Sequence, residues 1–224
     1  MVASRSVSID ASGGSTLEGD LVLPDAAAGI IVFAHGTGSS RHSPRNRSVA
    51  EHLQQRGLAT LLIDLLTAEE EHADLRGGQL RFDVELLASR LAASVDWMRR
   101  QPGLDELPLG YFGASTGAAA ALIAAADRPA ETAAVVSRGG RPDLAGSSLG
   151  RVRCPTLLIV GGDDPVVLEL NQRALTELAV EASLEVVPGA THLFEEPGAL
   201  EVVADLATHW FLVHVAGIDH GTGL

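Results

Sequence analysis

The sequence places one serine in a setting typical of nucleophilic catalysis. Ser115 is the central residue of Gly-Ala-Ser-Thr-Gly (residues 113–117), between an apolar run at 109–112 and the helix-forming run Ala118 to Ala126. A G-x-S-x-G sequence between strand and helix holds its serine in a sharp turn with the hydroxyl projecting from the sheet. Such a hydroxyl attacks an acyl carbonyl once a base removes its proton. A tight glycine-rich turn without chemistry is the structural alternative.

A histidine and an aspartate follow two later apolar runs. Asp164 ends Gly-Gly-Asp-Asp (161–164) after the run 156–160, and His192 follows the run 184–187. Side chains at the carboxyl ends of parallel strands meet at one edge of the sheet. The chain order serine, aspartate, histidine is similar to that of α/β-hydrolases. We therefore expect His192 to act as the base for Ser115 and Asp164 to orient the imidazole.

Three other residues compete for these two roles. Asp163 stands beside Asp164, and only the Gly-x-x-Asp spacing favours Asp164 as the orienting carboxylate. His35 and His42 are the rival bases, but neither follows the last predicted strand. The sequence therefore favours Asp164 and His192.

The oxyanion that forms during acyl transfer needs hydrogen-bond donors. In α/β-hydrolases the loop after the third strand and the residue after the nucleophile each supply a backbone N–H. By this resemblance the donors are Thr37, in His-Gly-Thr-Gly-Ser-Ser (35–40), and Thr116. The loop also resembles a dinucleotide-binding loop, but that motif needs a third glycine where Arg41 stands.

Two arginines are candidates for contact with the substrate. Arg138 follows the sixth predicted strand and so lies near the sheet edge of Ser115, and Arg41 lies just beyond the loop 35–40. A guanidinium can hold a carboxylate through two hydrogen bonds. Arginines at strand ends also pair with acids of the same chain, so both positions have a structural alternative.

The composition excludes several other classes of function. The chain of 224 residues has a formal net charge of −13, which repels nucleic-acid phosphates and anionic membranes. All sixteen basic residues are arginine, so a Walker-type phosphate loop and a Schiff-base lysine are absent. The histidines and acidic residues show no metal-ligand spacing. We expect no cofactor, metal, nucleic acid or membrane partner.

The single cysteine and the chain ends indicate a cytoplasmic protein. Cys154 has no second cysteine with which to form an intramolecular disulfide, and its place before an apolar run favours a buried packing thiol over a reactive one. Residues 1–10 lack the apolar core of a signal peptide, and the longest apolar stretch, 118–126, is too short to span a bilayer. We expect a cytoplasmic monomer or homodimer with a flexible tail at 216–224.

Apolar runs bounded by turn residues predict eight strands, and helical spacing between them predicts five helices. From the third run onward the strands are continuously apolar, which indicates parallel strands covered on both faces. A turn at 11–15 predicts an antiparallel hairpin at one edge. The polar segment 66–79 is expected to be a solvated loop, with a flap over the site as the alternative. The expected strands are 6–9, 17–23, 29–34, 59–64, 109–113, 133–136, 156–160 and 184–187, and the expected helices 46–56, 81–100, 116–127, 168–178 and 198–213.

These segments together resemble the dienelactone-hydrolase-like branch of the α/β-hydrolases, over about residues 17–211. The resemblance implies one α/β domain over 1–224: an eight-stranded, mostly parallel sheet with an antiparallel N-terminal edge, helices on both faces and little or no cap. It also implies a serine hydrolase of small esters or lactones. Dienelactone hydrolase itself has a cysteine nucleophile where this chain has Ser115, so serine-dependent esterases are the closer comparison. The alternatives are an acyltransferase or perhydrolase with the same triad, and a non-catalytic binding scaffold.

Overall fold

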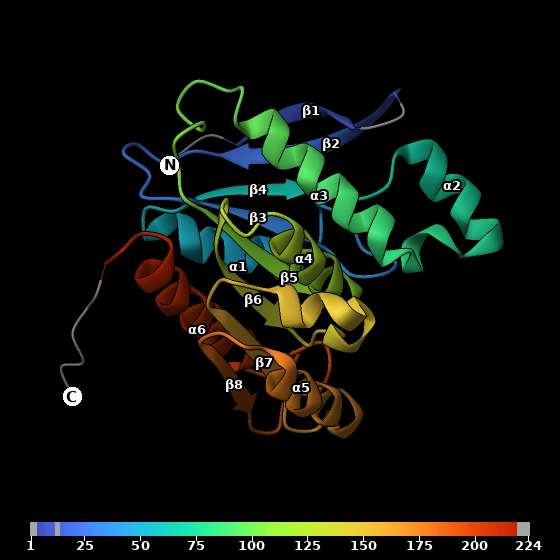
Figure 1. The fold of residues 1–224 in the computed structure, drawn as a ribbon, viewed down its shortest axis with the longest axis vertical. Coiled ribbons are helices and arrows are strands. Elements are labelled where there is room, and N and C mark those ends of the chain that lie inside the picture. Colours follow the sequence, from blue (N-terminus) through green and yellow to red (C-terminus); the bar gives the residue numbers. More distant parts are fainter. Residues whose placement is uncertain (1–3, 12–13, 219–224) are drawn as a thin grey trace.

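One mixed β-sheet organises the residues that the computed structural model describes, 4–11 and 14–218 (Figure 1). Its strand order is β1-β2-β4-β3-β5-β6-β7-β8. The pairs β1–β2 and β2–β4 are antiparallel, and all other neighbours in the sheet are parallel. The expected sheet with its antiparallel N-terminal edge is therefore confirmed. The strands are β1 (Arg5–Ala11), β2 (Ser15–Val22), β3 (Ile30–Ala34), β4 (Ala59–Ile63), β5 (Leu109–Ala114), β6 (Thr132–Arg138), β7 (Thr156–Gly161) and β8 (Ala182–Val187).

Helices cover both faces of this sheet (Figure 1). Three pack on one face, over a core that includes Tyr111, and two pack on the other, over a core that includes Phe33 and Phe211. The first three are α3 (Val84–Met98), α4 (Thr116–Asp127) and α5 (Pro165–Glu177), and the other two are α1 (Pro44–Gln55) and α6 (Ala199–His214).

Helix α4 is buried on all sides, and its composition explains why. Its residues from Thr116 to Ala126 are all buried, and most of them are alanine. Alanine favours the helix and adds little bulk, so the helix axis can approach the sheet closely. α4 therefore packs against β5, and its first turn starts directly at the carboxyl end of that strand.

The segment 66–79 is not the loop that its polarity predicted. It contains α2 (Ala68–Gly77), and a short 3₁₀ turn, η2 (Leu80–Phe82), follows it. Thr67 Oγ1 accepts the N–H of Glu70, and the Glu70 carboxylate accepts the N–H of Thr67. This reciprocal capping box is a helix-start signal that the polar composition obscured. A further 3₁₀ segment, η3 (Pro142–Arg151), also lies outside the expected helices.

The structure describes only part of the expected hairpin turn at 11–15 and of the expected tail at 216–224. Residues 12–13 of the hairpin turn and 219–224 of the tail lie outside the described residues. In the described part of the tail, the N–H of Ile218 donates to the Leu212 carbonyl oxygen at 2.9 Å, which ties this segment to α6. Within the described chain, no helix combines the length and the apolar character needed to cross a membrane.

Burial of Cys154 predicts an unreactive thiol. The residue is 3% exposed, and burial raises the pKa of its thiol to about 11. At pH 8 only about one molecule in a thousand would carry the thiolate that reacts. We expect Ellman's reagent to titrate almost no thiol in the native protein at pH 8 and one thiol per chain after denaturation in guanidinium. Full reaction of the native protein within minutes would contradict the buried placement.

Candidate active site

The turn between β5 and α4 holds Ser115 in an unusual backbone conformation. Its φ is 52° and its ψ is −121°. A non-glycine residue in such a region costs about 1–3 kcal/mol and is found where the surrounding structure enforces it. The enforcing neighbours are glycines, because a Cβ on Gly113 would overlap the backbone of Ala118, and a Cβ on Gly117 would overlap the Ala34 carbonyl oxygen. The first turn of α4 therefore packs closely against the ends of β5 and β3, and Ser115 between the two glycines adopts the strained conformation.

Asp164 and His192 form a hydrogen-bonded pair across two loops. The N–H of Asp163 donates to the Ala190 carbonyl oxygen at 2.9 Å, and Gly161 leaves no space for a Cβ beside that oxygen. This backbone contact joins the turn after β7 to the loop after β8. It brings His192 Nδ1 to 2.7 Å from Asp164 Oδ2.

The pair determines which nitrogen of the imidazole can act as a base. A carboxylate only accepts hydrogen bonds, so in the neutral imidazole of His192 the proton is on Nδ1 and the lone pair is on Nε2. The other oxygen of Asp164 accepts the N–H of Val167 at 3.4 Å and caps α5. The Asp164 side chain is 15% exposed and that of His192 38%, so the carboxylate is shielded while the imidazole is accessible.

Ser115 and His192 line the same pocket. Gly36, in the loop after β3, also lines it, and a Cβ added there would lie 3.0 Å from Ser115 Cβ. On the other side, Arg138 ends β6 and accepts the Ser115 N–H on its carbonyl oxygen at 3.2 Å. The loops that follow β3, β5, β6 and β8 therefore converge at the carboxyl edge of the parallel strands.

The structure separates the rival histidines from this pocket. His35 Nε2 accepts the N–H of Leu65 at 3.1 Å, and its Nδ1 lies 3.0 Å from the Gly36 carbonyl oxygen, to which it donates. Burial lowers the pKa of His35, so the ring is neutral and both nitrogens serve the backbone. His42 is exposed and lies 3.8 Å from Asp20. Neither imidazole is among the groups that line the pocket with the serine.

The two threonines predicted for the oxyanion hole are direct neighbours. The N–H of Thr37 donates to Thr116 Oγ1 at 3.0 Å, and the two hydroxyl oxygens are 3.0 Å apart. The Thr37 hydroxyl donates in turn to the Arg81 carbonyl oxygen at 3.3 Å. The N–H of Thr116 stands at the first position of α4, where a helix offers no internal acceptor. In this structure the Thr37 N–H is therefore occupied by Thr116 Oγ1.

The two candidate arginines have different surroundings. Arg41 forms ion pairs with Asp64 and Asp20, and its own N–H donates to Asp64 Oδ1 at 2.7 Å. It is absent from the lining of the pocket that holds Ser115, because these carboxylates draw it toward β2 and β4. Arg138 does line that pocket and is 7% exposed.

The N-terminus of α1 contributes pocket residues that the sequence did not single out. Ser43 caps this helix by accepting the Asn46 N–H at 3.3 Å, and Ser43, Arg45 and Asn46 all line the pocket. The signal was Ser43 followed by Pro44, since a serine cap followed by proline marks a helix start. This signal places the start of the helix at Pro44, two residues before the expected start at residue 46 and next to the pocket.

A second pocket lies between the loop 35–40 and α2. Its lining includes His35, Asp64, Leu75 and Arg81, but neither Ser115 nor His192. We therefore assign the chemistry to the pocket that holds the serine. In residues 4–11 and 14–218, no group of three or more His, Cys, Asp or Glu side chains is placed to hold a metal ion.

The fold and the site geometry together define the class of protein. A sheet of this order, with a serine in the β5–α4 turn and an Asp-His pair after β7 and β8, is the α/β-hydrolase architecture. The sequence model of the dienelactone hydrolase family matches residues 17–211. The chain belongs to the dienelactone hydrolase family.

Individual proteins similar to this chain include two solved structures and one relative named for another activity. A solved dienelactone hydrolase from Anabaena variabilis is 58% identical with a TM-score of 0.93, over 96% of this chain and 99% of that chain. Est1E from Butyrivibrio proteoclasticus shares the fold, with 17% identity and a TM-score of 0.78 over 94% of this chain and 99% of that chain. A Mycobacterium tuberculosis protein named "Putative phosphoribosyl transferase" is 61% identical over 206 residues, which are 92% of this chain and 46% of that protein. The chain therefore spans about half the length of this relative.

The close approach at Gly117 is testable through stability. Gly117→Ala places a methyl group against backbone oxygen, and such overpacking costs about 3 kcal/mol. For a chain of this size, that lowers the melting temperature by about 6–12 °C. Gly150→Ala is the control, because its added Cβ would meet nothing within 4 Å. Equal melting temperatures for the two variants in differential scanning calorimetry would contradict the proposed packing.

Proposed function

We propose that this protein is a serine hydrolase that cleaves small carboxylic esters or lactones through an acyl-enzyme. The observation that carries the proposal is that His192, whose Nδ1 lies 2.7 Å from Asp164 Oδ2, lines one pocket with a serine held at φ 52°. A positioned hydroxyl, an oriented base and nearby backbone N–H donors are the groups that acyl transfer requires.

The first half of the reaction acylates the serine. His192 Nε2 accepts the proton of the Ser115 hydroxyl as its oxygen attacks the carbonyl carbon, and Asp164 stabilises the imidazolium that forms. The N–H groups of Thr116 and Thr37 donate to the oxyanion, with the Thr116 hydroxyl displaced from Thr37. When the intermediate collapses, His192 returns the proton to the leaving alkoxide.

The second half releases the acyl group. His192 removes a proton from water, the resulting hydroxide attacks the acyl carbon, and the proton returns to the Ser115 oxygen as the ester bond breaks. Apart from the attacking water, this scheme uses only side chains and backbone groups of the chain. Because a lactone is a cyclic ester, the same steps open it to a hydroxy acid.

One of the two similar proteins of high identity supports hydrolysis of an acyl compound. The Anabaena protein, described as a dienelactone hydrolase, aligns with 96% of this chain. The Mycobacterium protein is named for a different activity, but this chain corresponds to only 46% of its length. We therefore base the proposal on the pocket and on the family.

Removal of the proposed nucleophile gives the first test of this function. Ser115→Ala should lower the rate on a short p-nitrophenyl ester by on the order of 10⁴-fold, because it removes the group that forms the acyl-enzyme. It should also abolish labelling by a fluorophosphonate probe, which the native protein should accept. An unchanged rate in the variant would overturn the assignment.

The same assay separates the alternative functions. A native protein that ignores the fluorophosphonate would be a binding scaffold with this fold. A protein that takes the probe but converts the ester faster when an alcohol, amine or peroxide is added would be an acyltransferase or perhydrolase.

The two adjacent aspartates provide a second test. Asp164→Asn keeps a good helix cap for α5 but replaces the accepting carboxylate with an amide that can donate to His192 Nδ1. The imidazole proton then moves to Nε2, which can no longer accept the serine proton, so kcat should fall by about 10³-fold or more.

Asp163→Asn is the matched control for this variant. The Asp163 side chain is exposed, and the bond of its backbone N–H to Ala190 survives the substitution. Its kcat should stay close to that of the native protein. If Asp163→Asn were the damaging change, the orienting role would belong to Asp163.

A further inference from the structure

A buried guanidinium without a counter-charge stands in the proposed active site. Arg138 is 7% exposed, and its Nη2 donates to Asn46 Oδ1 at 3.3 Å. Among the described residues, its Nε and Nη1 are buried and have no hydrogen-bond partner. A charged group buried in this way is costly unless an opposite charge and hydrogen-bond acceptors meet it. The side chain is therefore poised to receive an anion.

The immediate neighbours of Arg138 add positive charge or none. Its guanidinium carbon lies 5.9 Å from the centre of the Phe194 ring, and the neutral Asn46 takes one of its donors. Burial, together with the positive charge of Arg45, lowers the pKa of Arg138 to about 10. Arg45 Nη1 donates to Glu195 at 3.1 Å, but that carboxylate is 64% exposed and so is well solvated.

A helix terminus adds a third positive element. Ser43, Arg45 and Asn46 belong to the cap and first turn of α1, and all three line the pocket. The N-terminus of a helix carries about half a positive charge. In α1, Pro44 has no N–H and the Asn46 N–H already donates to Ser43 Oγ, so the helix contributes mainly through this dipole. In a chain with a formal net charge of −13, two guanidinium groups and a helix N-terminus thus meet beside one serine.

We propose that Arg138, Arg45 and the first turn of α1 form a subsite for a compact anion, a carboxylate or a phosphoryl group carried by the substrate. The inference rests on the proposed hydrolase function, because Ser115 and His192 line the same pocket. It narrows the substrate class from esters and lactones in general to those whose acyl part carries a negative charge. The anion supplies the acceptors that Arg138 Nε and Nη1 lack within the described chain.

The positive charge of Arg138, Arg45 and the α1 N-terminus can attract an anionic substrate locally, although the protein as a whole is negatively charged. The overall negative charge repels anions at long range, but that repulsion is screened over about 8–10 Å in physiological salt. Inside the pocket, charge-assisted hydrogen bonds to a guanidinium are stronger than neutral ones. Arg41 cannot take this role, because it is already paired with Asp64 and Asp20.

Three esters of similar length test the subsite in the native protein. They are p-nitrophenyl pentanoate, the mono-p-nitrophenyl ester of glutaric acid and p-nitrophenyl 4-phosphonobutanoate, which are neutral, carboxylate-bearing and phosphonate-bearing. We expect kcat/KM to be about 10-fold or more higher for at least one anionic ester than for pentanoate. The preferred anion then distinguishes a carboxylate from a phosphoryl substrate. Equal or better turnover of pentanoate would overturn the subsite while leaving the hydrolase function intact.

Variants assign the preference to Arg138. The readout is the ratio of kcat/KM for the preferred anionic ester to that for pentanoate, measured on one preparation, so that loss of folded protein cancels. Arg138→Met should bring this ratio to about one, and Arg138→Lys should restore part of it. Arg45→Met should lower it less, because Glu195 already pairs with Arg45. A ratio that survives Arg138→Met would refute the assignment.

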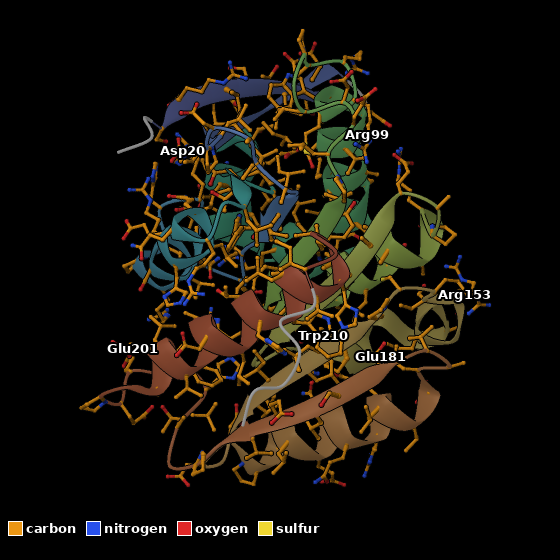
Figure 2. The ribbon with its side chains drawn as sticks, turned by 90° about the vertical axis from the view of Figure 1, so that its left-hand side faces the viewer. Asp20, Arg99, Arg153, Glu181, Glu201 and Trp210 are labelled. Atoms are coloured by element: carbon orange, nitrogen blue, oxygen red, sulfur yellow. The ribbon has the colours of Figure 1, made fainter. Side chains whose placement is uncertain are left out.

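Arg153→Met is the matched control for loss of a positive charge. Arg153 is exposed, its side chain donates to backbone carbonyl oxygens, and it precedes β7 at the opposite edge of the sheet. Figure 2 shows it on the side of the molecule opposite Glu201, which lies in the first turn of α6 after the His192 loop. The ratio should stay at its native value in this variant.

If none of the three esters is cleaved, direct measurement of anion binding still tests the subsite. Titration calorimetry with glutarate and with inorganic phosphate should then still show binding to the native protein and loss of binding in Arg138→Met. That pattern would refute the hydrolase proposal and keep the anion subsite. Absence of binding of both anions by the native protein would refute the subsite itself.

Discussion

The close approach of α4 to the end of β5 is the constraint on which the site depends. Gly113 has no Cβ, so α4 can start directly against β5, and Gly117 has none, so the same first turn can lie against the end of β3. The intervening Ser115 takes a φ of 52°. The burial of α4 on all sides keeps the helix in this place. The strain at one residue is thus offset by apolar packing over the whole helix, and the serine hydroxyl remains in the pocket at the sheet edge.

A second close approach assembles the base. Gly161 lies against the Ala190 carbonyl oxygen, and this backbone contact holds the turn that carries Asp164 beside the loop that carries His192. Unusual backbone conformations recur in the same region, since Phe194 also has a positive φ, of 55°. Such residues cluster where a structure enforces geometry for function. The contacts that form the pocket are therefore mostly backbone contacts between loops, which explains why glycines recur in these loops.

Much of this arrangement could be predicted from the sequence, because it depends on local patterns. Continuous apolar runs predicted the parallel strands, and the G-x-S-x-G turn with the order of Ser115, Asp164 and His192 predicted the class of fold. The partners of side chains could not be predicted in the same way. Arg41 and Arg138 look alike in the sequence. The antiparallel pairing of β2 with β4, however, puts Asp20 and Asp64 beside Arg41, whereas Arg138 is buried and pairs with no carboxylate of the described residues. The bond between the Thr37 N–H and the Thr116 hydroxyl likewise exists only after the loops meet.

The central claim is that these contacts activate one hydroxyl group for covalent chemistry. Its most direct test is mass spectrometry of the protein after acid quench during turnover of a slowly hydrolysed ester, followed by peptide mapping. We predict an adduct with the mass of one acyl group on the peptide that contains Ser115, formed and lost at rates consistent with turnover. Turnover without any acyl adduct, or with the adduct on another residue, would contradict the account.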